Sequence, residues 1–459
     1  MKILMINLPS VSKKYNKLVP ILSSLNYPSF NVPLNLCYLA TPLIKAGHNV
    51  KILDLNFLLL KKFGFQNHKS FVNNLEAGNA KGQRLVFLKK ILKKELKNGY
   101  DLVGLNGDFI NASVFILKQV KLFNPNIKCI VGGHTATRNF ETFLKKGFDF
   151  VVLGDGEDPI LEVVKYLEKK SSITDLYNIA FIYKNKIYYR LKKVEPTKLP
   201  PIRNLVDYKE YMNYTANSIV FSSRGCKGSC IFCSRKLIPV YSLRNIKELI
   251  SEIKSIKNKY TVNYFWFYDD NINNDEIHLR RLCLTLIKNK LNIKWACYSR
   301  AENLSGETIK LMSLAGCKRI SFGIESGSPK MLTIIKKNIN LKKALQIIRQ
   351  CKKQGILVRV SLIYDLPGET WKDILLSLKF LMQAQPHSFY FYKLQILQGS
   401  FLYDHFDTYF KEDFMICQGS KIRKRNLVSC INIFFKDVFL YPVNKFGMLL
   451  DLVFSFLKS

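Results

Sequence analysis

The chain of 459 residues is long enough for two or three domains, and its 48% of hydrophobic residues can fill large cores. Its 71 lysines and arginines against 34 aspartates and glutamates give a net charge of +37, which favours anionic partners. No nucleic-acid-binding motif accompanies this charge, so we expect no specific nucleic-acid partner. Eleven scattered cysteines and the lack of a secretory signal argue against a disulfide-bonded secreted protein and favour the cytoplasm. No apolar run is long enough to span a bilayer.

Residues 1–170 are predicted to form an open, doubly wound, Rossmann-like α/β domain. Continuous Val/Ile/Leu runs separated by helical segments favour a parallel sheet covered on both faces, and ligands of such sheets bind beyond the carboxyl ends of the strands. The candidate strands are Lys2–Asn7, Val50–Leu55, Leu102–Asn106, Cys129–Gly132 and Phe150–Gly154, and the candidate helices are Asn35–Ala46, Ala112–Phe123, Asn139–Lys146 and Asp158–Lys169.

Two of these strands end in glycines, in the runs Cys129-Ile-Val-Gly-Gly-His134 and Val151-Val-Leu-Gly-Asp-Gly-Glu157. Glycine lets a backbone approach a large ligand closely, although each run alone is more typical of a tight turn. We expect His48 and His134 to be turn or surface residues rather than metal ligands.

Residues 171–215 are predicted to be a connector. The segments Ile179–Tyr183 and Lys186–Arg190 flank a predicted turn at Lys184-Asn185 and form a candidate hairpin, and Leu199-Pro-Pro201 then breaks the chain.

From 216 to 400 the alternation of strands and helices restarts and predicts a partial (β/α)6 barrel, whose reactive groups would gather at the carboxyl ends of the strands. The candidate strands are Ser218–Ser223, Asn263–Tyr268, Ile293–Ser299, Arg319–Gly323, Leu357–Ile363 and Ser388–Leu394, with helices such as Ile246–Lys257 and Leu341–Gln354 between them.

Three cysteines with the spacing C-x3-C-x2-C follow the first barrel strand: Cys226, Cys230 and Cys233. Three thiolates can hold three irons of a [4Fe–4S] cluster and leave the fourth iron open to a small chelating ligand. A structural zinc site and three incidental core thiols are the alternatives. Zinc usually closes with a fourth Cys or His from paired C-x2-C units, and no second pair occurs in this sequence. We therefore expect these three cysteines to ligate iron.

Polar residues also end the next strands of the barrel. Asp269 and Asp270 could receive an ammonium group or cap a helix. Arg300 suits the recognition of a planar anion. The fourth strand ends in Ser321-Phe-Gly-Ile-Glu-Ser-Gly327, which places Glu325 at the barrel mouth, and the fifth leads into Leu362-Ile-Tyr-Asp-Leu-Pro-Gly-Glu-Thr370.

Residues 401–459 are predicted to be a helical C-terminal extension. A basic cluster, Lys421–Arg425, precedes an interrupted apolar stretch from Ile431 to Leu457. This combination predicts either peripheral contact with an anionic membrane or a helix packed over the barrel mouth.

The cysteine run, with Phe232 before its last cysteine, resembles the signature of radical S-adenosylmethionine (SAM) enzymes. The resemblance implies that the open iron binds the amino and carboxylate groups of SAM. An external electron donor such as flavodoxin or ferredoxin would then drive cleavage of SAM to a 5′-deoxyadenosyl radical. By the same resemblance, Asp269 or Asp270 would hold the SAM amino group, Arg300 would pair with its carboxylate or a neighbouring acid, and Glu325 would bind its ribose. Tyr364 and Asp365 stand where the family usually has small residues, which would tune specificity.

Residues 1–170 resemble the cobalamin-binding domain of class B radical SAM enzymes. The resemblance rests on the two glycine runs and on Pro33-Leu-Asn-Leu-Cys-Tyr-Leu-Ala40, Ala46-Gly-His-Asn-Val50 and Ile52-Leu-Asp54. It implies that the nucleotide tail of cobalamin lies against Gly132, Gly133, Gly154 and Gly156, and that the loop from Asn106 to Phe109 lies near the lower face of the cobalt. The Asp-x-His-x-x-Gly motif of other cobalamin proteins is absent, so cobalamin would bind without a His ligand or the domain would bind none.

The resemblance makes a cobalamin-dependent methyltransferase acting on an unactivated carbon the leading hypothesis. A cyclisation, rearrangement or epimerisation without methyl transfer is the second hypothesis, and a non-enzymatic iron–sulfur sensor or scaffold is the third. The substrate stays open among small molecules, lipids and peptides, and the basic charge with the apolar tail leans toward a lipid or an acidic intermediate.

Overall fold

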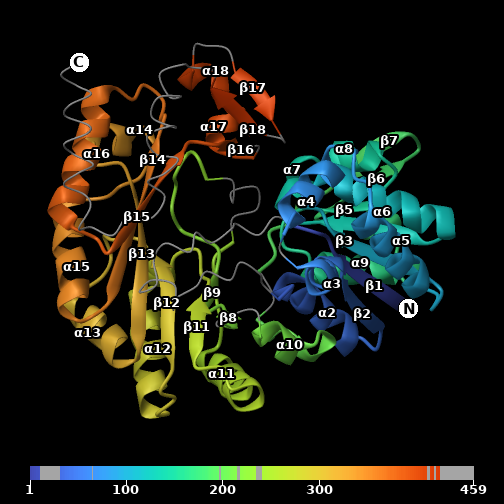
Figure 1. Ribbon diagram of the computed structural model, residues 1–459, viewed down its shortest axis with the longest axis horizontal. Coiled ribbons are helices and arrows are strands. Elements are labelled where there is room, and N and C mark those ends of the chain that lie inside the picture. Colours follow the sequence, from blue (N-terminus) through green and yellow to red (C-terminus); the bar gives the residue numbers. More distant parts are fainter. Residues whose placement is uncertain are drawn as a thin grey trace. The chain divides into compact units, whose positions relative to one another are not determined.

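The computed structural model describes residues 1–10, 32–64, 66–195, 198–213, 218–233, 240–397 and 399–410, and the backbone of 414–417 and 420–423. The chain divides into two compact units, Met1–Ala216 and Asn217–Ser459 (Figure 1). The division places the predicted connector, 171–215, within the first unit.

The first unit is built on a seven-stranded sheet in the order β2-β1-β3-β4-β5-β6-β7. Its strands are β1 (Lys2–Asn7), β2 (Asn49–Asp54), β3 (Leu102–Asn106), β4 (Lys128–Gly132), β5 (Phe150–Val152), β6 (Ile179–Tyr183) and β7 (Lys186–Tyr189). The first five strands are parallel, which confirms the Rossmann-like prediction. The predicted hairpin forms β6 and β7 and extends this sheet, with β6 antiparallel to β5 and β7 antiparallel to β6.

Helices cover both faces of this sheet, as shown by β1, in which Ile3, Leu4, Met5 and Ile6 are all buried. The helices are α2 (Leu34–Lys45), α3 (Leu55–Phe63), α4 (His68–Glu76), α5 (Gln83–Leu96), α6 (Ile110–Phe123), α7 (His134–Arg138), α8 (Phe140–Lys145), α9 (Glu157–Leu167) and α10 (Tyr208–Met212), with short 3₁₀ turns η1 (Ile173–Asp175) and η2 (Arg203–Leu205). Helix α2 packs against α9, and α5 packs against α3 and α6.

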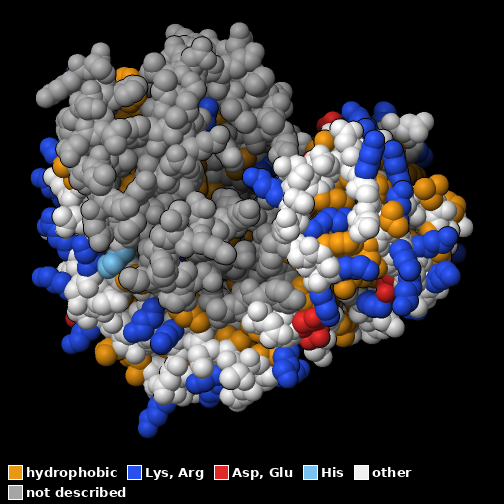
Figure 2. All heavy atoms as spheres, in the orientation of Figure 1, with side chains coloured by type: hydrophobic (Ala, Val, Ile, Leu, Met, Phe, Trp, Pro, Cys, Tyr) orange, Lys and Arg blue, Asp and Glu red, His pale blue; other side chains and the backbone are white. Residues whose placement is uncertain are grey.

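Helices α3, α4, α5 and α7 were not among the predicted helices. The apolar run of β2 continues into α3 without a break in hydrophobicity, and the boundary is set by Asp54, whose side chain accepts a hydrogen bond from the Phe57 backbone N–H. In α5 the leucines Leu88, Leu92 and Leu96 recur every four residues and are buried beneath a lysine-rich outer face. On the face shown in Figure 2, Lys and Arg side chains are dispersed rather than gathered in one patch.

The second unit contains a six-stranded sheet in the order β15-β14-β13-β12-β11-β8, with all neighbours parallel. Its strands are β8 (Ser218–Val220), β11 (Tyr264–Phe267), β12 (Lys294–Ser299), β13 (Cys317–Glu325), β14 (Leu357–Tyr364) and β15 (Ser388–Lys393), and the helices between them are α11 (Ile246–Tyr260), α12 (Glu276–Lys288), α13 (Gly306–Leu314), α14 (Pro329–Ile334), α15 (Leu341–Lys353) and α16 (Trp371–Ala384). Figure 1 shows the strands fanning out with the helices along one side. The predicted partial barrel is confirmed.

Within its described residues, the predicted helical extension begins with helix and continues as strand. Short helices α17 (Phe401–Asp404) and α18 (Phe406–Tyr409) are followed by β17 (Phe414–Cys417) and β18 (Ser420–Arg423), which form a three-stranded antiparallel sheet with β16 (Ile396–Leu397). The apolar stretch from Ile431 to Leu457 lies outside the described residues. Among the residues that the structure describes, no helix is long and apolar enough to cross a membrane.

Candidate active site

The cysteine loop starts at the carboxyl end of β8, between two short paired strands, β9 (Ser223–Arg224) and β10 (Ser242–Leu243). Gly225 has a φ of +83°, and a Cβ at this position would overlap the carbonyl oxygen of Val240 on the returning arm of the loop. Only glycine allows the two arms to pass so closely. Cys226, Cys230 and Cys233 are all free thiols in this structure.

Ile231 anchors the loop between two helices of the second unit. Ile231 is 1% exposed and packs in an apolar cluster with Ile335, which directly follows α14, and with Leu402 and Phe406 of the C-terminal segment. The Ile231 N–H donates to the Ile335 carbonyl at 3.1 Å, and the Ile231 carbonyl accepts from the Leu402 N–H at 2.9 Å. The start of the C-terminal extension therefore packs directly on the cysteine loop.

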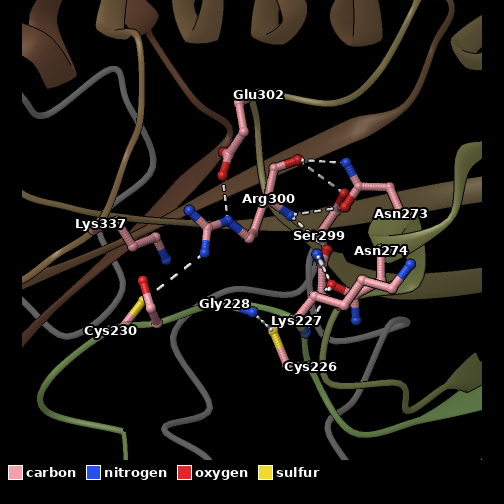
Figure 3. A network of polar contacts seen from close by, with 12 residues as sticks. Cys226, Lys227, Gly228, Cys230, Asn273, Asn274, Ser299, Arg300, Glu302 and Lys337 are labelled. Atoms are coloured by element: carbon pink, nitrogen blue, oxygen red, sulfur yellow. Dashed lines mark hydrogen bonds and ion pairs between the residues drawn. The ribbon is translucent and has the colours of Figure 1, made fainter. Parts of the chain in front are cut away.

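Arg300, at the carboxyl end of β12, lies between two of the thiols (Figure 3). Its Nη1 is 3.9 Å from Cys230 Sγ. Gly228 makes room for this arrangement, because a Cβ there would lie 2.7 Å from Arg300 Nη1 and 3.3 Å from Cys226 Sγ. Burial raises the pKa of the Cys230 thiol, whereas the nearby cations of Lys337 and Arg300 act in the opposite direction.

The loop carries the donor chemistry of an iron–sulfur cluster, with three thiols on one short segment and two cations beside them to balance thiolate charge. Cys233 lies next to Cys230, whose carbonyl accepts a hydrogen bond from the Cys233 N–H at 3.2 Å. Within the described residues, no group of three or more His, Cys, Asp or Glu side chains is arranged to hold a metal ion. The structure thus brings Cys226 and Cys230 to Arg300 but does not close the three thiols into a metal site.

Arg300 is fixed by its neighbours on every side. Its Nε donates to Glu302, and its backbone N–H donates to the side-chain oxygens of Asn271 at 2.9 Å and Asn273 at 3.1 Å. Burial alone would lower the pKa of Arg300, but Glu302 and the thiols of Cys230 and Cys226 raise it above its ordinary value. Arg300 is therefore a permanently charged, preorientated anion receptor.

Asn274, on the short turn η3 (Ile272–Asn274), connects that turn to the cysteine loop, and the sequence analysis did not single it out. Its side-chain oxygen accepts hydrogen bonds from the Lys227 N–H at 3.4 Å and from the thiol of Cys226 at 3.7 Å, and its Nδ2 donates to the Gly225 carbonyl at 3.2 Å. The only sequence signal is that three asparagines, at 271, 273 and 274, follow the predicted carboxylate pair.

Asp269, one of the two candidates for the SAM amino group, is 1% exposed and already engaged. Its carboxylate accepts hydrogen bonds from the backbone N–H groups of Ser222 and Ser223 and from their hydroxyls at 2.8 and 2.7 Å. Burial raises its pKa, although these bonds pull the pKa down. Asp269 holds the turn between β8 and β9 in place, and the assignment of the SAM amino group to Asp269 or Asp270 stays a prediction.

Glu325 ends β13 in the left-handed region, with a φ of +70°, at an irregularity in the pairing with β14. Its Oε1 forms an ion pair with Lys337 Nζ at 3.0 Å. A Cβ on Gly323 would overlap Glu325 Oε1 and lie 3.1 Å from Lys337 Nζ, so this glycine makes room for the pair. The sequence analysis found Glu325 but not Lys337.

The end of β14 carries a second ion pair, between Asp365 and Lys393 at 3.8 Å. Asp365 also has a positive φ, +68°, where a glycine would be unstrained. Its N–H donates to Glu369 at 2.6 Å, and burial raises the pKa of Glu369 to about 7. Tyr364 is buried with its ring 5.3 Å from that of Phe391. The structure thus places the unusual Tyr364-Asp365 step at the barrel mouth.

In the first unit, the loops assigned to the cobalt face and to the tail groove lie together. The Gly107 N–H donates to the Gly132 carbonyl at 2.7 Å, and a Cβ on Gly133 would lie 3.1 Å from Asn106 Oδ1. Gly133 and Gly154 have positive φ angles of 106° and 84°. These glycines themselves place no side chain at the carboxyl edge of β3, β4 and β5, which fits the close approach of a large planar ligand.

Two of the four predicted tail-groove glycines also have a packing role. A Cβ on Gly132 would lie 3.2 Å from Val152 Cβ, and one on Gly156 would lie 2.9 Å from Leu39 and 3.1 Å from Val152. Their assignment to cobalamin stays a prediction. His48 lies 3.6 Å from Glu168, and His134 begins α7.

Residues 220–381 match the profile of a family described as the Radical SAM superfamily. Cytidylyl-2-hydroxyethylphosphonate methyltransferase of Streptomyces wedmorensis is 25% identical over 424 residues, which cover 81% of this chain and 77% of that protein. Anaerobic magnesium-protoporphyrin IX monomethyl ester cyclase of Synechocystis sp. is 24% identical over 368 residues, 77% of this chain and 68% of that protein. The solved structure of the cobalamin-dependent S-adenosylmethionine radical enzyme OxsB, with aqua-cobalamin bound, matches with a TM-score of 0.73 at 14% identity and covers 95% of this chain and 67% of its own. This last match shows that the two chains share a fold.

Proposed function

We propose that this chain, whose residues 220–381 match the Radical SAM superfamily, is a cobalamin-dependent methyltransferase that acts on an unactivated carbon. The observation that carries the proposal is the grouping of Cys226, Cys230 and Arg300 at the carboxyl ends of β8 and β12. Glu325 ends the next strand of the same sheet. In a βα barrel this edge is where reactive groups gather.

The chain's own residues would bind the cluster, orient SAM and keep water away from both. Cys226, Cys230 and Cys233 would hold a [4Fe–4S] cluster, which supplies the electron that cleaves SAM when an external donor has reduced it. Arg300 would receive the SAM carboxylate, because its guanidinium is fixed by Glu302 and lies beside the thiols.

Glu325 would bind the ribose hydroxyls with the carboxylate oxygen that Lys337 does not hold, and Asp270 would accept the amino group. Asp269 stabilises the backbone of this site by accepting hydrogen bonds from the hydroxyls of Ser222 and Ser223. The apolar cluster around Ile231 keeps water away from one side of the cysteine loop.

Three observations support cobalamin as the second cofactor. The five parallel strands of the first unit have the order 2-1-3-4-5, which opens a ligand crevice at the carboxyl ends of β1 and β3. The loop from Asn106 to Asp108 meets the Gly132-Gly133 turn at that edge. OxsB, whose fold this chain shares, is a cobalamin-dependent radical enzyme. Methyl transfer as the reaction is supported by the relative from Streptomyces wedmorensis, which is named a methyltransferase.

For the test, the protein is purified without oxygen and its iron–sulfur cluster is reconstituted. The protein is then incubated with hydroxocobalamin and desalted. We expect near-stoichiometric cobalt per chain and, after reduction with SAM carrying a deuterated methyl group, both S-adenosylhomocysteine and 5′-deoxyadenosine. Retained cobalt with 5′-deoxyadenosine alone would contradict methyl transfer. Such a result would favour the second candidate, a cyclisation or rearrangement, which the similarity to a cyclase of Synechocystis sp. supports.

A further inference from the structure

Lys337 is a buried cation whose only part in the proposed function is to hold one carboxylate oxygen of Glu325. Its residue is 6% exposed, whereas lysine is almost never fully buried unless its ammonium group is paired. It follows the carboxyl end of α14, and its backbone is held on both sides, because its N–H donates to the Leu332 carbonyl and its carbonyl accepts from the Ile339 N–H, both at 2.8 Å. The position of the side chain is therefore set by the fold and not by the pairing alone.

The ammonium group of Lys337 faces two parts of the site. It forms the ion pair with Glu325 Oε1 at 3.0 Å, and both side chains are largely withdrawn from water, at 7% and 12% exposed. In Figure 3 the Lys337 side chain extends toward Cys230 on the same side as the guanidinium of Arg300. Burial would lower the pKa of Lys337, but Glu325 and Cys230 raise it, so the group is charged at neutral pH.

A fixed positive charge at a poorly solvated position next to a cluster ligand changes the reduction potential of the cluster. Reduction of an iron–sulfur cluster adds one negative charge, and a nearby cation stabilises the reduced form more than the oxidised form. The interaction is weakly screened because water has little access to the pair. The same cation also holds one oxygen of Glu325, which leaves the other oxygen to a ligand.

We propose that Lys337 is a positioning residue that raises the reduction potential of the cluster at Cys230 while it orients Glu325 toward SAM. The inference rests on the proposed function insofar as it requires the three cysteines to hold a [4Fe–4S] cluster. Lys337 touches neither the substrate nor the reacting atoms. It sets how easily the external donor can reduce the cluster, and hence whether SAM is cleaved.

The experiment is a potentiometric titration of the rebuilt cluster, followed by EPR, on the full chain without SAM. Lys337→Met removes the charge and keeps an unbranched side chain one atom shorter, and it leaves the Glu325 carboxylate uncompensated. Both changes disfavour the reduced cluster, so we expect its potential to fall by about 59 mV or more, a tenfold change in the ratio of reduced to oxidised cluster. Lys337→Arg keeps the charge and should stay close to the wild type.

The matched control is Lys336→Met. Lys336 is the preceding residue and carries the same charge, but it is exposed and its Nζ lies 4.7 Å from the ring of Phe401. We expect this variant to have the wild-type potential, which would exclude an effect of overall charge. If Lys337→Met does not assemble a cluster, Lys337→Gln is titrated in its place, with the same expected direction.

An unchanged potential in the charge-removing variants, with wild-type iron content, would overturn the proposal. So would loss of the cluster from both Lys337→Met and Lys337→Gln while Lys336→Met assembles one, because Lys337 would then serve only to hold the loop together. Failure of the proposed function looks different, since the wild-type chain itself would then assemble no cluster or show one that ignores SAM.

Discussion

The guanidinium Nη1 of Arg300 lies 3.9 Å from the sulfur of Cys230, although 69 residues separate the two in the chain. The contact exists because β8 and β12 both end at the same edge of the sheet, with β11 between them. It places an anion receptor next to a predicted iron ligand. A ligand that binds the open iron through its own carboxylate would meet this guanidinium.

Replacing Arg300 tests that geometry. Arg300→Gln keeps a polar side chain of similar shape but removes the charge, and a hydrogen bond to a charged group contributes about 1.5–3 kcal/mol. We therefore expect SAM to bind about tenfold to a hundredfold more weakly, measured by titrating SAM into the rebuilt protein and following the EPR spectrum of the cluster. Arg280→Gln, at an arginine that pairs with exposed Glu307, is the control and should bind SAM normally. Unchanged affinity in Arg300→Gln would remove Arg300 from the SAM site.

We expect Asp269 to have a structural role and Asp270 to have a role in binding SAM. Asp269→Asn disrupts a carboxylate that is bonded to two backbone N–H groups and two hydroxyls in the core, so we expect the second unit to lose about 3 kcal/mol of stability or more. Asp270→Asn should keep the stability and weaken SAM binding. Thermal unfolding of the apo-protein and SAM titration measure the two effects, and the reverse pattern would show that Asp269 is the ligand-binding residue.

Leu402 is expected to stabilise the cysteine loop from the C-terminal segment. Leu402 is fully buried against Ile231, and truncating a buried leucine to alanine costs about 2–5 kcal/mol. The Leu402→Ala variant should therefore lose iron to a chelator faster than the wild type, as followed by the decay of cluster absorbance. Leu375→Ala, on the partly exposed face of α16, should not. Equal rates in all three proteins would mean that the loop does not depend on this segment.

Asp54 makes the stability of the first unit depend on pH. It is buried at the carboxyl end of β2 and accepts a hydrogen bond from Tyr211 Oη at 2.6 Å, and burial raises its pKa from 3.8 to about 6. A carboxyl group whose pKa is raised by folding binds protons more tightly in the folded state, so stability is highest below pH 4 and falls as the pH rises to about 6. The loss is at most about 3 kcal/mol.

Denaturant unfolding of the apo-protein at a series of pH values measures this dependence. We expect it to disappear in Asp54→Asn and to persist in Asp404→Asn, at an exposed aspartate of the second unit. A wild-type first unit whose stability rises over the same pH range would contradict the assignment.

The sequence predicted the sheets and the cysteines because both are encoded locally. Strands such as Leu102–Asn106 are continuous apolar runs, and the cysteine spacing lies within one loop. What it did not predict depends on contacts between distant segments. Lys337 is one of many lysines until the fold buries it beside Glu325, and Leu402 gains its role only where its N–H meets the Ile231 carbonyl. Asp269 matched the expected ligand type, and only the structure shows that two serines already hold it.

The most direct test of the central claim is the formation of 5′-deoxyadenosine from SAM by the reduced, rebuilt protein, compared between the wild type and Cys230→Ala. The account predicts steady formation by the wild type and none by the variant, because the cluster would lose one of its three protein ligands. Cys351→Ala, which removes a buried cysteine of α15, should remain active. Full turnover by Cys230→Ala, or no 5′-deoxyadenosine from a wild-type protein with an intact cluster, would contradict the account.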